Sequence, residues 1–195
     1  MEQITNILYW LSTGMLIPVV VFLLFFFIRS IMMIGIFYGH YISRTKVNVK
    51  LNREIDSCPI NELLENLPAP GEKSPAIISA LERIRNNRNK SAMMDKIIGD
   101  YEIQADKDLG KSKLLVKIGP MLGLMGTLIP MGPALVGLAT GDVASMANNM
   151  QVAFSTTVVG IIIGAVGFIT LQVKQRWAAD DMNMLEYVVE SLKQR

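Results

Sequence analysis

The sequence predicts an all-α membrane protein in which three transmembrane helices are extended by cytoplasmic helices. Hydrophobic residues make up 51% of the 195 residues, and the mean hydropathy of +0.36 is high for a soluble protein. Only 18% of the residues are charged, and they are unevenly placed: no Lys or Arg precedes Arg29, and none lies between Lys117 and Lys174. Long uncharged blocks between charged ones are typical of a multi-pass membrane protein.

The N-terminal segment, residues 1–42, carries the first predicted transmembrane helix. Two registers are open: a span of 5–28 with Arg29 at its cytoplasmic end, and a span of 14–38 with Arg29 inside the membrane. A centrally buried Arg costs at least about 2.5–3.5 kcal/mol, which counts against the second register, whereas the polar Asn6, Ser12 and Thr13 count against the first. We therefore place the span near 12–36 as a compromise and interpret Arg29 as a snorkelling side chain. No basic residue precedes the apolar run, which favours a retained helix over a signal peptide.

Residues 43–113 form a charged segment that we predict to be a cytoplasmic helical loop. A Pro- and Gly-containing stretch at 68–73 separates two short helices. The second has Ile77, Leu81 and Ile84 on one face and a basic end, which we interpret as a solvated cluster in preference to a lipid contact. From about Ser91 the chain can stay helical until it enters the membrane.

Residues 114–139 and 152–173 are the second and third predicted transmembrane helices, and 140–151 is the connection between them. Each helix has a stripe of small residues that includes one threonine, at steps of three and four that place the stripe on one face. The two stripes are Gly123, Thr127, Pro130, Ala134 and Ala153, Thr157, Gly160, Gly164, Gly167. Two interpretations are open: close helix packing with threonines bonded to their own helix, or the lining of a shared interior.

The C-terminal segment, residues 174–195, is a predicted cytoplasmic helix with an apolar seam. The seam packs against the chain's own loop helices or between subunits, and the sequence leaves both open. Basic residues flank the spans at 43–113 and 174–195, so the positive-inside rule places both segments in the cytoplasm, and the N-terminus and the 140–151 connection outside. We interpret Asp142 in that connection as a turn or cap residue. The seam residues are Ala178, Met182, Leu185, Val189 and Leu192.

The residue types argue against an enzyme. With one histidine, His40, and one cysteine, Cys58, the chain offers no nucleophile–base set, no metal cluster and no intrachain disulfide. It has no phosphate-binding glycine motif, and we expect neither cofactor nor metal. The net charge of +2 gives no reason to expect nucleic acid as a partner.

Two segments resemble the signature sequences of the MotA/TolQ/ExbB proton-channel family. The pattern P-x-x-G-L-x-G-T is matched from Pro120 to Thr127, and the pattern A-T-A-x-G-L is matched loosely from Thr156 to Gly160 and the isoleucine after it. The size, the three spans, the external N-terminus and the large cytoplasmic loop are more similar to TolQ and ExbB than to the four-span MotA.

The resemblance implies a homopentameric ring in the inner membrane around single-span partners of the ExbD, TolR or MotB type. Such a subunit couples proton or sodium flow to work, and a partner aspartate carries the ion. Carried onto this chain, the ion path is Thr127 and Thr157 with Thr156 as a neighbour, while Gly123, Pro130, Gly160 and Gly164 pack the pore helices. The glutamate often found five residues before the third-span threonine is replaced by Val152 here. The alternative is a passive oligomeric membrane scaffold or anchor that conducts no ions.

Overall fold

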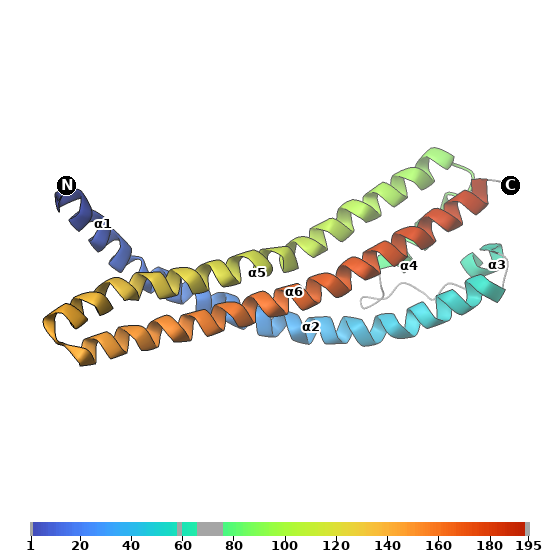
Figure 1. Ribbon diagram of the computed structural model, residues 1–195. Helices are drawn as coiled ribbons and strands as arrows, with labels where there is room; N and C mark the ends of the chain where they lie inside the picture. The colour runs from blue at the N-terminus through green and yellow to red at the C-terminus, as the bar shows by residue number, and fades with distance from the viewer. Residues whose placement is uncertain (1, 58–59, 66–75, 194–195) are drawn as a thin grey trace. The chain divides into compact units, whose positions relative to one another are not determined.

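The computed structural model describes residues 2–57, 60–65 and 76–193, and these residues form six helices (Figure 1). No strand occurs within these ranges, which confirms the predicted all-α class. The predicted loop at 68–73 lies outside the described residues. The helices are α1 (Glu2–Gly14), α2 (Leu16–Ser57), α3 (Ile60–Glu65), α4 (Ala76–Asn86), α5 (Ser91–Thr140) and α6 (Val143–Lys193).

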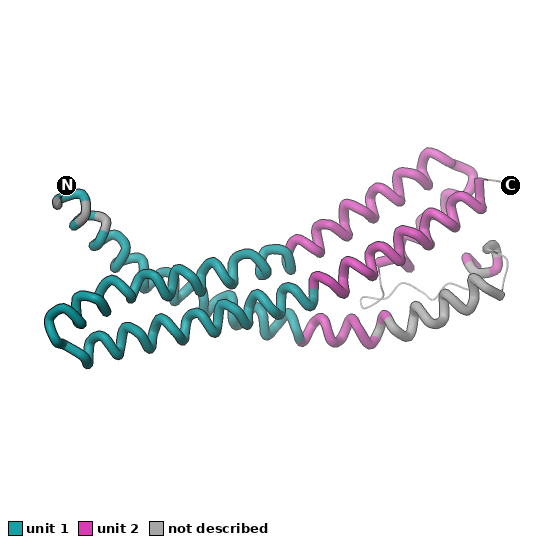
Figure 2. Tube along the Cα trace, viewed as in Figure 1, with its two compact units in different colours: residues 1–34, 111–170 teal, residues 35–110, 171–195 magenta. Residues whose placement is uncertain are grey.

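The chain divides into two compact units (Figure 2). Unit 1 comprises Met1–Ile34 and Lys111–Thr170, so it holds α1, the start of α2 and the α5–α6 hairpin. Unit 2 comprises Gly35–Gly110 and Leu171–Arg195, with α3, α4 and the remaining parts of α2, α5 and α6.

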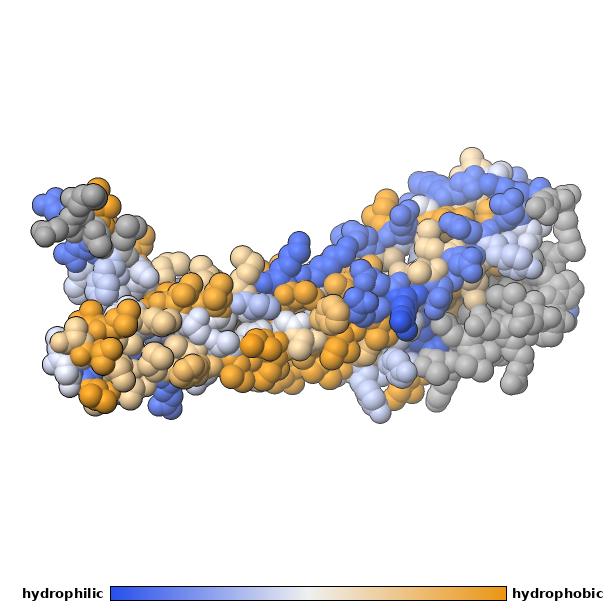
Figure 3. All heavy atoms as spheres, in the orientation of Figure 1, coloured by the Kyte–Doolittle hydropathy of each residue, from blue (hydrophilic) through white to orange (hydrophobic). Residues whose placement is uncertain are grey.

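Three helical segments are long and apolar enough to cross a membrane: Tyr9–Ile42, Ser91–Thr140 and Val143–Lys193. In unit 1 they present large apolar side chains outward (Figure 3). Such a surface is unsuited to water and suited to lipid or to other membrane helices. The protein is therefore a multi-pass membrane protein, as predicted. Examples of these exposed residues are Ile17, Phe22, Phe25, Leu124, Leu128, Leu135, Phe154, Val158 and Ile161.

A tight turn joins α5 to α6. Gly141 has a φ of 75°, a left-handed conformation that glycine adopts without steric cost. The carboxylate Oδ1 of Asp142 accepts a hydrogen bond of 3.0 Å from the backbone N–H of Ser145, the geometry of a helix N-cap. The interpretation of Asp142 as a cap residue is confirmed.

Contacts within unit 1 bear on the depth of Arg29. Met33 of α2 lies beside Ser112 of α5, with 3.9 Å between the thioether sulfur and the hydroxyl oxygen. The two helices run in opposite directions (Figure 1), so Arg29 and Lys117 lie one turn or slightly more from this contact, on the same side of it. Both cations therefore lie at a similar depth. Since Lys117 directly precedes the uncharged part of α5, this match favours the register that ends the first span at Arg29.

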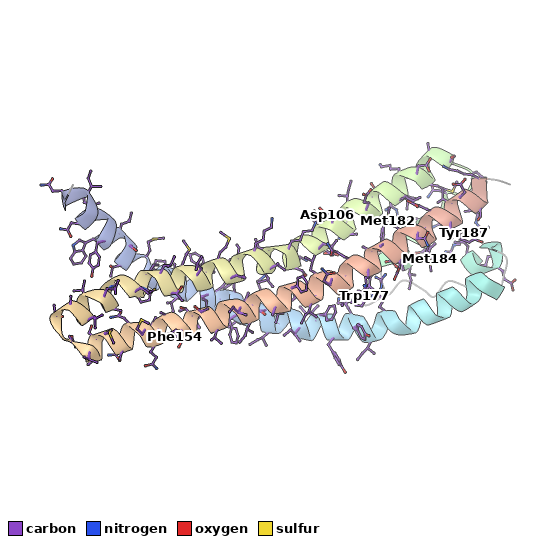
Figure 4. All side chains as sticks on the ribbon, in the orientation of Figure 1. Asp106, Phe154, Trp177, Met182, Met184 and Tyr187 are labelled. Atoms are coloured by element: carbon purple, nitrogen blue, oxygen red, sulfur yellow. The ribbon has the colours of Figure 1, made fainter. Side chains whose placement is uncertain are left out.

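Unit 2 has an ordinary hydrophobic core that closes around α4. The predicted apolar face of α4 is buried, with Ile77, Leu81 and Ile84 each 0% exposed. The C-terminal seam packs into the same core: Leu185 and Val189 are buried, and the partly buried Met182 (labelled in Figure 4) and Leu192 pack against them. The structure thus pairs the seam with helices of its own chain. The α5 residues Met94, Ile97 and Tyr101 complete this core.

Candidate functional site

The small residues of α5 and α6 pack directly against each other. A Cβ atom added at Gly119 would lie 2.8 Å from the carbonyl oxygen of Gly160, and one added at Gly160 would lie 2.7 Å from the Cα of Gly123. Real side chains do not tolerate such distances, so glycine is what lets the two backbones touch. Farther along the same face, a Cβ added at Gly164 would lie 2.9 Å from the ring of Pro120.

Thr156 is placed inside this packed face. It is 6% exposed, and its side chain would be 2.6 Å from a Cβ added at Gly126. Its hydroxyl donates to the carbonyls of Val152 and Ala153, at 3.0 and 2.9 Å. The structure therefore gives Thr156 a packing position between the two helices.

Thr127 and Thr157 lie at the border of the packed face and are partly exposed. Gly126 of α5 contacts Thr156 of α6. Thr127 directly follows Gly126 and Thr157 directly follows Thr156, so the two threonines lie at the same level of the hairpin. The Thr127 hydroxyl donates to the Leu124 carbonyl at 2.7 Å, and the Thr157 hydroxyl donates to the Ala153 carbonyl at 3.1 Å. Each hydroxyl hydrogen is thus used within its own helix, and each oxygen keeps lone pairs that can accept.

The remaining predicted residues belong to the same hairpin. Gly123, Pro130, Gly160 and Gly164 are all buried. Pro130 lies inside α5 and has no N–H to donate to the carbonyl of Gly126, so that carbonyl loses its usual helical partner.

One family model matches the sequence segments that contain these residues. It is that of the MotA/TolQ/ExbB proton channel family, and it covers residues 72–186, more than half of the chain. This chain belongs to the MotA/TolQ/ExbB proton channel family. Neither the curated proteins nor the solved structures contain a significant match.

Members of the MotA/TolQ/ExbB family form oligomeric membrane channels that work with partner proteins. The matched range contains α5 and α6 as far as Glu186, with the glycine face and both border threonines. It also contains α4 and the core residue Leu185 of α6. The match thus covers the membrane part of the hairpin and most of the core of unit 2.

The site of this MotA/TolQ/ExbB family member lacks an acid of its own. Between residues 118 and 173 the only carboxylate is Asp142, which is engaged as the helix cap at the turn. Within the described residues, no group of three or more His, Cys, Asp or Glu side chains could hold a metal ion. The hairpin can therefore offer hydroxyl and carbonyl acceptors, but no group that carries a proton.

Sequence reasoning missed a buried polar cluster in unit 2. Arg44 of α2 pairs with Asp181 of α6, and the hydroxyl of Tyr101 of α5 donates to the same carboxylate. The guanidinium also donates to the Trp177 carbonyl at 3.0 Å and lies 5.1 Å from the centre of that indole ring (Trp177 is labelled in Figure 4). No spacing rule joins residues so far apart in sequence, so no signal was available.

Burial dominates the electrostatics of this cluster. It raises the pKa of the Asp181 carboxyl above its usual range, although the Tyr101 hydrogen bond and the Arg44 charge oppose the change. Burial beside this carboxylate also raises the pKa of the Tyr101 phenol. Both groups lie outside the predicted membrane spans.

Proposed function

We propose that this chain is a subunit of an ion-driven motor or stator in the cell's inner membrane. In this proposal a ring of copies, five as the family resemblance implies, surrounds single-span partner helices of the ExbD, TolR or MotB type. The partner contributes the membrane aspartate that carries a proton or a sodium ion. The observation that carries the proposal is the pair of border hydroxyls in a hairpin that the family model matches.

The hydroxyl geometry supports a role as acceptor. Because Thr127 and Thr157 donate to their own helix, their oxygens are free to accept from a protonated carboxyl group or to coordinate a cation. An aspartate inside a bilayer is expensive unless such polar partners receive it. The site would thus stabilise the carboxyl group of the partner when it carries its proton or its sodium ion.

The energy available per ion is adequate for mechanical work. Moving one elementary charge through the membrane potential supplies about 2.3 kcal/mol per 100 mV. Repeated single-ion steps could then drive rotation or sliding between ring and partner. In the proposed orientation the N-terminus and the hairpin turn face outward and the C-terminus faces the cytoplasm, because the basic residues gather around unit 2.

Substitution of the border threonine tests the proposal. Thr157→Val keeps the shape of the side chain but removes the acceptor oxygen, so we expect ion-driven activity of the reconstituted complex to be lost while the oligomer still forms. Thr157→Ser, which retains a hydroxyl, should keep most of the activity. Both variants are compared by ion flux into proteoliposomes and by the size of the purified complex.

The passive scaffold is the second candidate, and one observation favours it. Threonines bonded to their own helix also occur where they serve structure alone. For a scaffold, Thr157→Val would leave every measured property unchanged. Ion flux equal to that of the wild type in this variant, with the oligomer intact, would reject the assignment of Thr157 to the ion path. An assembled wild-type complex that carries no ion flux would favour the scaffold.

A further inference from the structure

The first helix, α1, has an apolar face that the described part of the chain leaves uncovered. Four apolar residues follow one another at steps of three and four, which places them along one side of the helix. They are 66%, 66%, 63% and 44% exposed in chain order. We call them the α1 apolar stripe, and they are Ile4, Ile7, Leu11 and Met15, the last of which directly follows the helix.

The opposite side of α1 is polar and is the side that meets the hairpin. Asn6, Tyr9 and Thr13 each lie two residues after a member of the stripe, which is a rotation of about 200° around the helix. The Tyr9 ring lies 3.8 Å from where a Cβ atom at Gly132 of α5 would be. The apolar stripe therefore points away from the chain's own hairpin.

A bend at Met15 carries the start of α1 away from the other helices. Gly14 and Pro18 flank this position, and both are residue types at which helices break or kink. Figure 1 shows that α1 changes direction relative to α2 and that its first turns lie apart from α5 and α6. Among the described residues, α1 thus contacts the hairpin near its C-terminal end only.

The α1 apolar stripe is continuous with a surface that is suited to lipid. The same spacing continues from Met15 through Pro18 to Phe22 and Phe25 of α2. Phe22 and Phe25 are 57% and 55% exposed and belong to the apolar outer surface of unit 1. Since the stripe prolongs this surface without a polar interruption, lipid is the occupant that fits it.

An aromatic pair marks the middle of α1. The rings of Tyr9 and Trp10 lie edge to face with 6.4 Å between their centroids, and Trp10 is 71% exposed. Tyrosine and tryptophan are enriched where a membrane meets water, because each has an apolar body and a polar group. In the register that ends the first span at Arg29, a crossing of about 20 residues begins near this pair.

The charges of this region exclude recognition of anionic lipid. No Lys or Arg precedes Arg29, and the only charged residue before it is Glu2. Helices that bind anionic membranes carry basic residues on their polar face, which α1 lacks. Any lipid contact of α1 must therefore rest on its apolar side chains.

We propose that α1 is an interfacial helix whose apolar stripe contacts lipid at the membrane face on which the N-terminus lies, while the side bearing Asn6 faces water. The contact is made with the acyl part of the lipid and is independent of lipid charge. This inference goes beyond the proposed function, since such a helix would serve a motor and a scaffold equally.

Fluorescence quenching at single cysteines tests the contact. Cys58 is the only cysteine, so a Cys58→Ser background carries no competing thiol. Ile4→Cys and Ile7→Cys report the stripe, and Asn6→Cys is the matched control between them on the opposite side. Each full-length variant is labelled with nitrobenzoxadiazole and reconstituted in phosphatidylcholine vesicles. Quenching by aqueous iodide is then compared with quenching by phosphatidylcholine that carries a nitroxide on its acyl chain.

We expect the nitroxide lipid to quench the labels at positions 4 and 7 at least about fivefold more than the label at position 6, and iodide to show the reverse order. Equal quenching of all three labels by iodide would place α1 in water. Equal quenching of all three by the nitroxide lipid would make α1 a simple continuation of the transmembrane span. Either result overturns the proposal.

Two further outcomes concern other occupants of the stripe. If the labels at positions 4 and 7 are shielded from both quenchers, protein covers the stripe, and disulfides between Ile4→Cys copies would identify that protein as a second copy. This result also overturns the proposal. Repeating the measurement with phosphatidylglycerol added should leave the ratios unchanged, and lipid contact that appears only with this anionic lipid would overturn the apolar contact.

Discussion

The helices within unit 1 and the helices within unit 2 pack against one another in opposite ways. In unit 1, α5 and α6 pack against each other at glycines. Because Gly119, Gly123 and Gly160 have no side chain, the two backbones come into direct contact. In unit 2 the core consists of large side chains such as Ile77, Leu81 and Leu185, together with one buried ionic cluster. The difference follows from the solvent.

Water drives large apolar side chains together, whereas lipid does not. In a bilayer the tails are as apolar as leucine, so helices associate through close van der Waals packing and small residues achieve the closest approach. In water each buried aliphatic side chain contributes about 1.5–3 kcal/mol, and bulk is an advantage. The same helices α5 and α6 follow the first rule in unit 1 and the second in unit 2.

The largest expected effect of a substitution concerns the buried cluster of unit 2. Asp181→Ala leaves the Arg44 guanidinium buried without its counter-ion, and we expect a loss of about 3–5 kcal/mol in the stability of this unit. In a Trp10→Phe background, Trp177 is the only tryptophan and its fluorescence reports urea unfolding at the cluster.

A matched variant separates the charge from the packing. Replacing all three polar members together, by Arg44→Met, Asp181→Leu and Tyr101→Phe, should recover most of that stability because no buried polar group remains unpaired. Equal stability of Asp181→Ala and the wild type would show that the cluster is not buried in the native state.

The next largest effect is expected in the hairpin. Gly160→Ala places a Cβ 2.7 Å from backbone atoms of α5, which cannot rotate away, so we expect a loss of about 1–3 kcal/mol and a weakened hairpin. Gly132→Ala is the control, because its added Cβ meets only the Tyr9 ring at an ordinary 3.8 Å. Thermal denaturation of the purified protein in detergent compares the two. Similar midpoints would contradict the packed glycine face.

A smaller effect is expected at Thr156. Its hydroxyl serves only its own helix and its shape fills the space beside Gly126, so Thr156→Val should change stability by less than about 1 kcal/mol. Ion flux should also be retained, in contrast to Thr157→Val. Loss of flux in Thr156→Val with the oligomer intact would move the ion path onto Thr156.

The smallest expected effect is a pH dependence of unit 2. Because burial raises the pKa of Asp181 in the folded state, the folded protein binds this proton more tightly than the unfolded chain does. The contribution of this group to stability is therefore greatest below its ordinary pKa and falls as the pH rises through the raised value. Asp181→Asn should remove that part of the pH dependence, as measured by urea unfolding from pH 4 to pH 8. If the pH profile of stability is the same in Asp181→Asn as in the wild type, the pH dependence arises from other titratable groups.

The sequence alone determined the membrane class, the three apolar segments and the faces of single helices. Hydropathy is a local sum, and helical spacing places Ile77 with Leu81 whatever the rest of the chain does. For the same reason the cap at Asp142 was predictable, since its partner Ser145 is three residues away. The seam containing Leu185 was also visible, but not what it packs against.

The tertiary structure decided the relations between helices. The register between α5 and α6 determined that Thr156 is buried while Thr127 and Thr157 border the packed face. A different pairing, between α2 and α6, brought Arg44 to Asp181. Such pairings depend on how two long helices slide and rotate against each other, and one residue of shift changes every partner. Spacing within one helix carries no information about that shift.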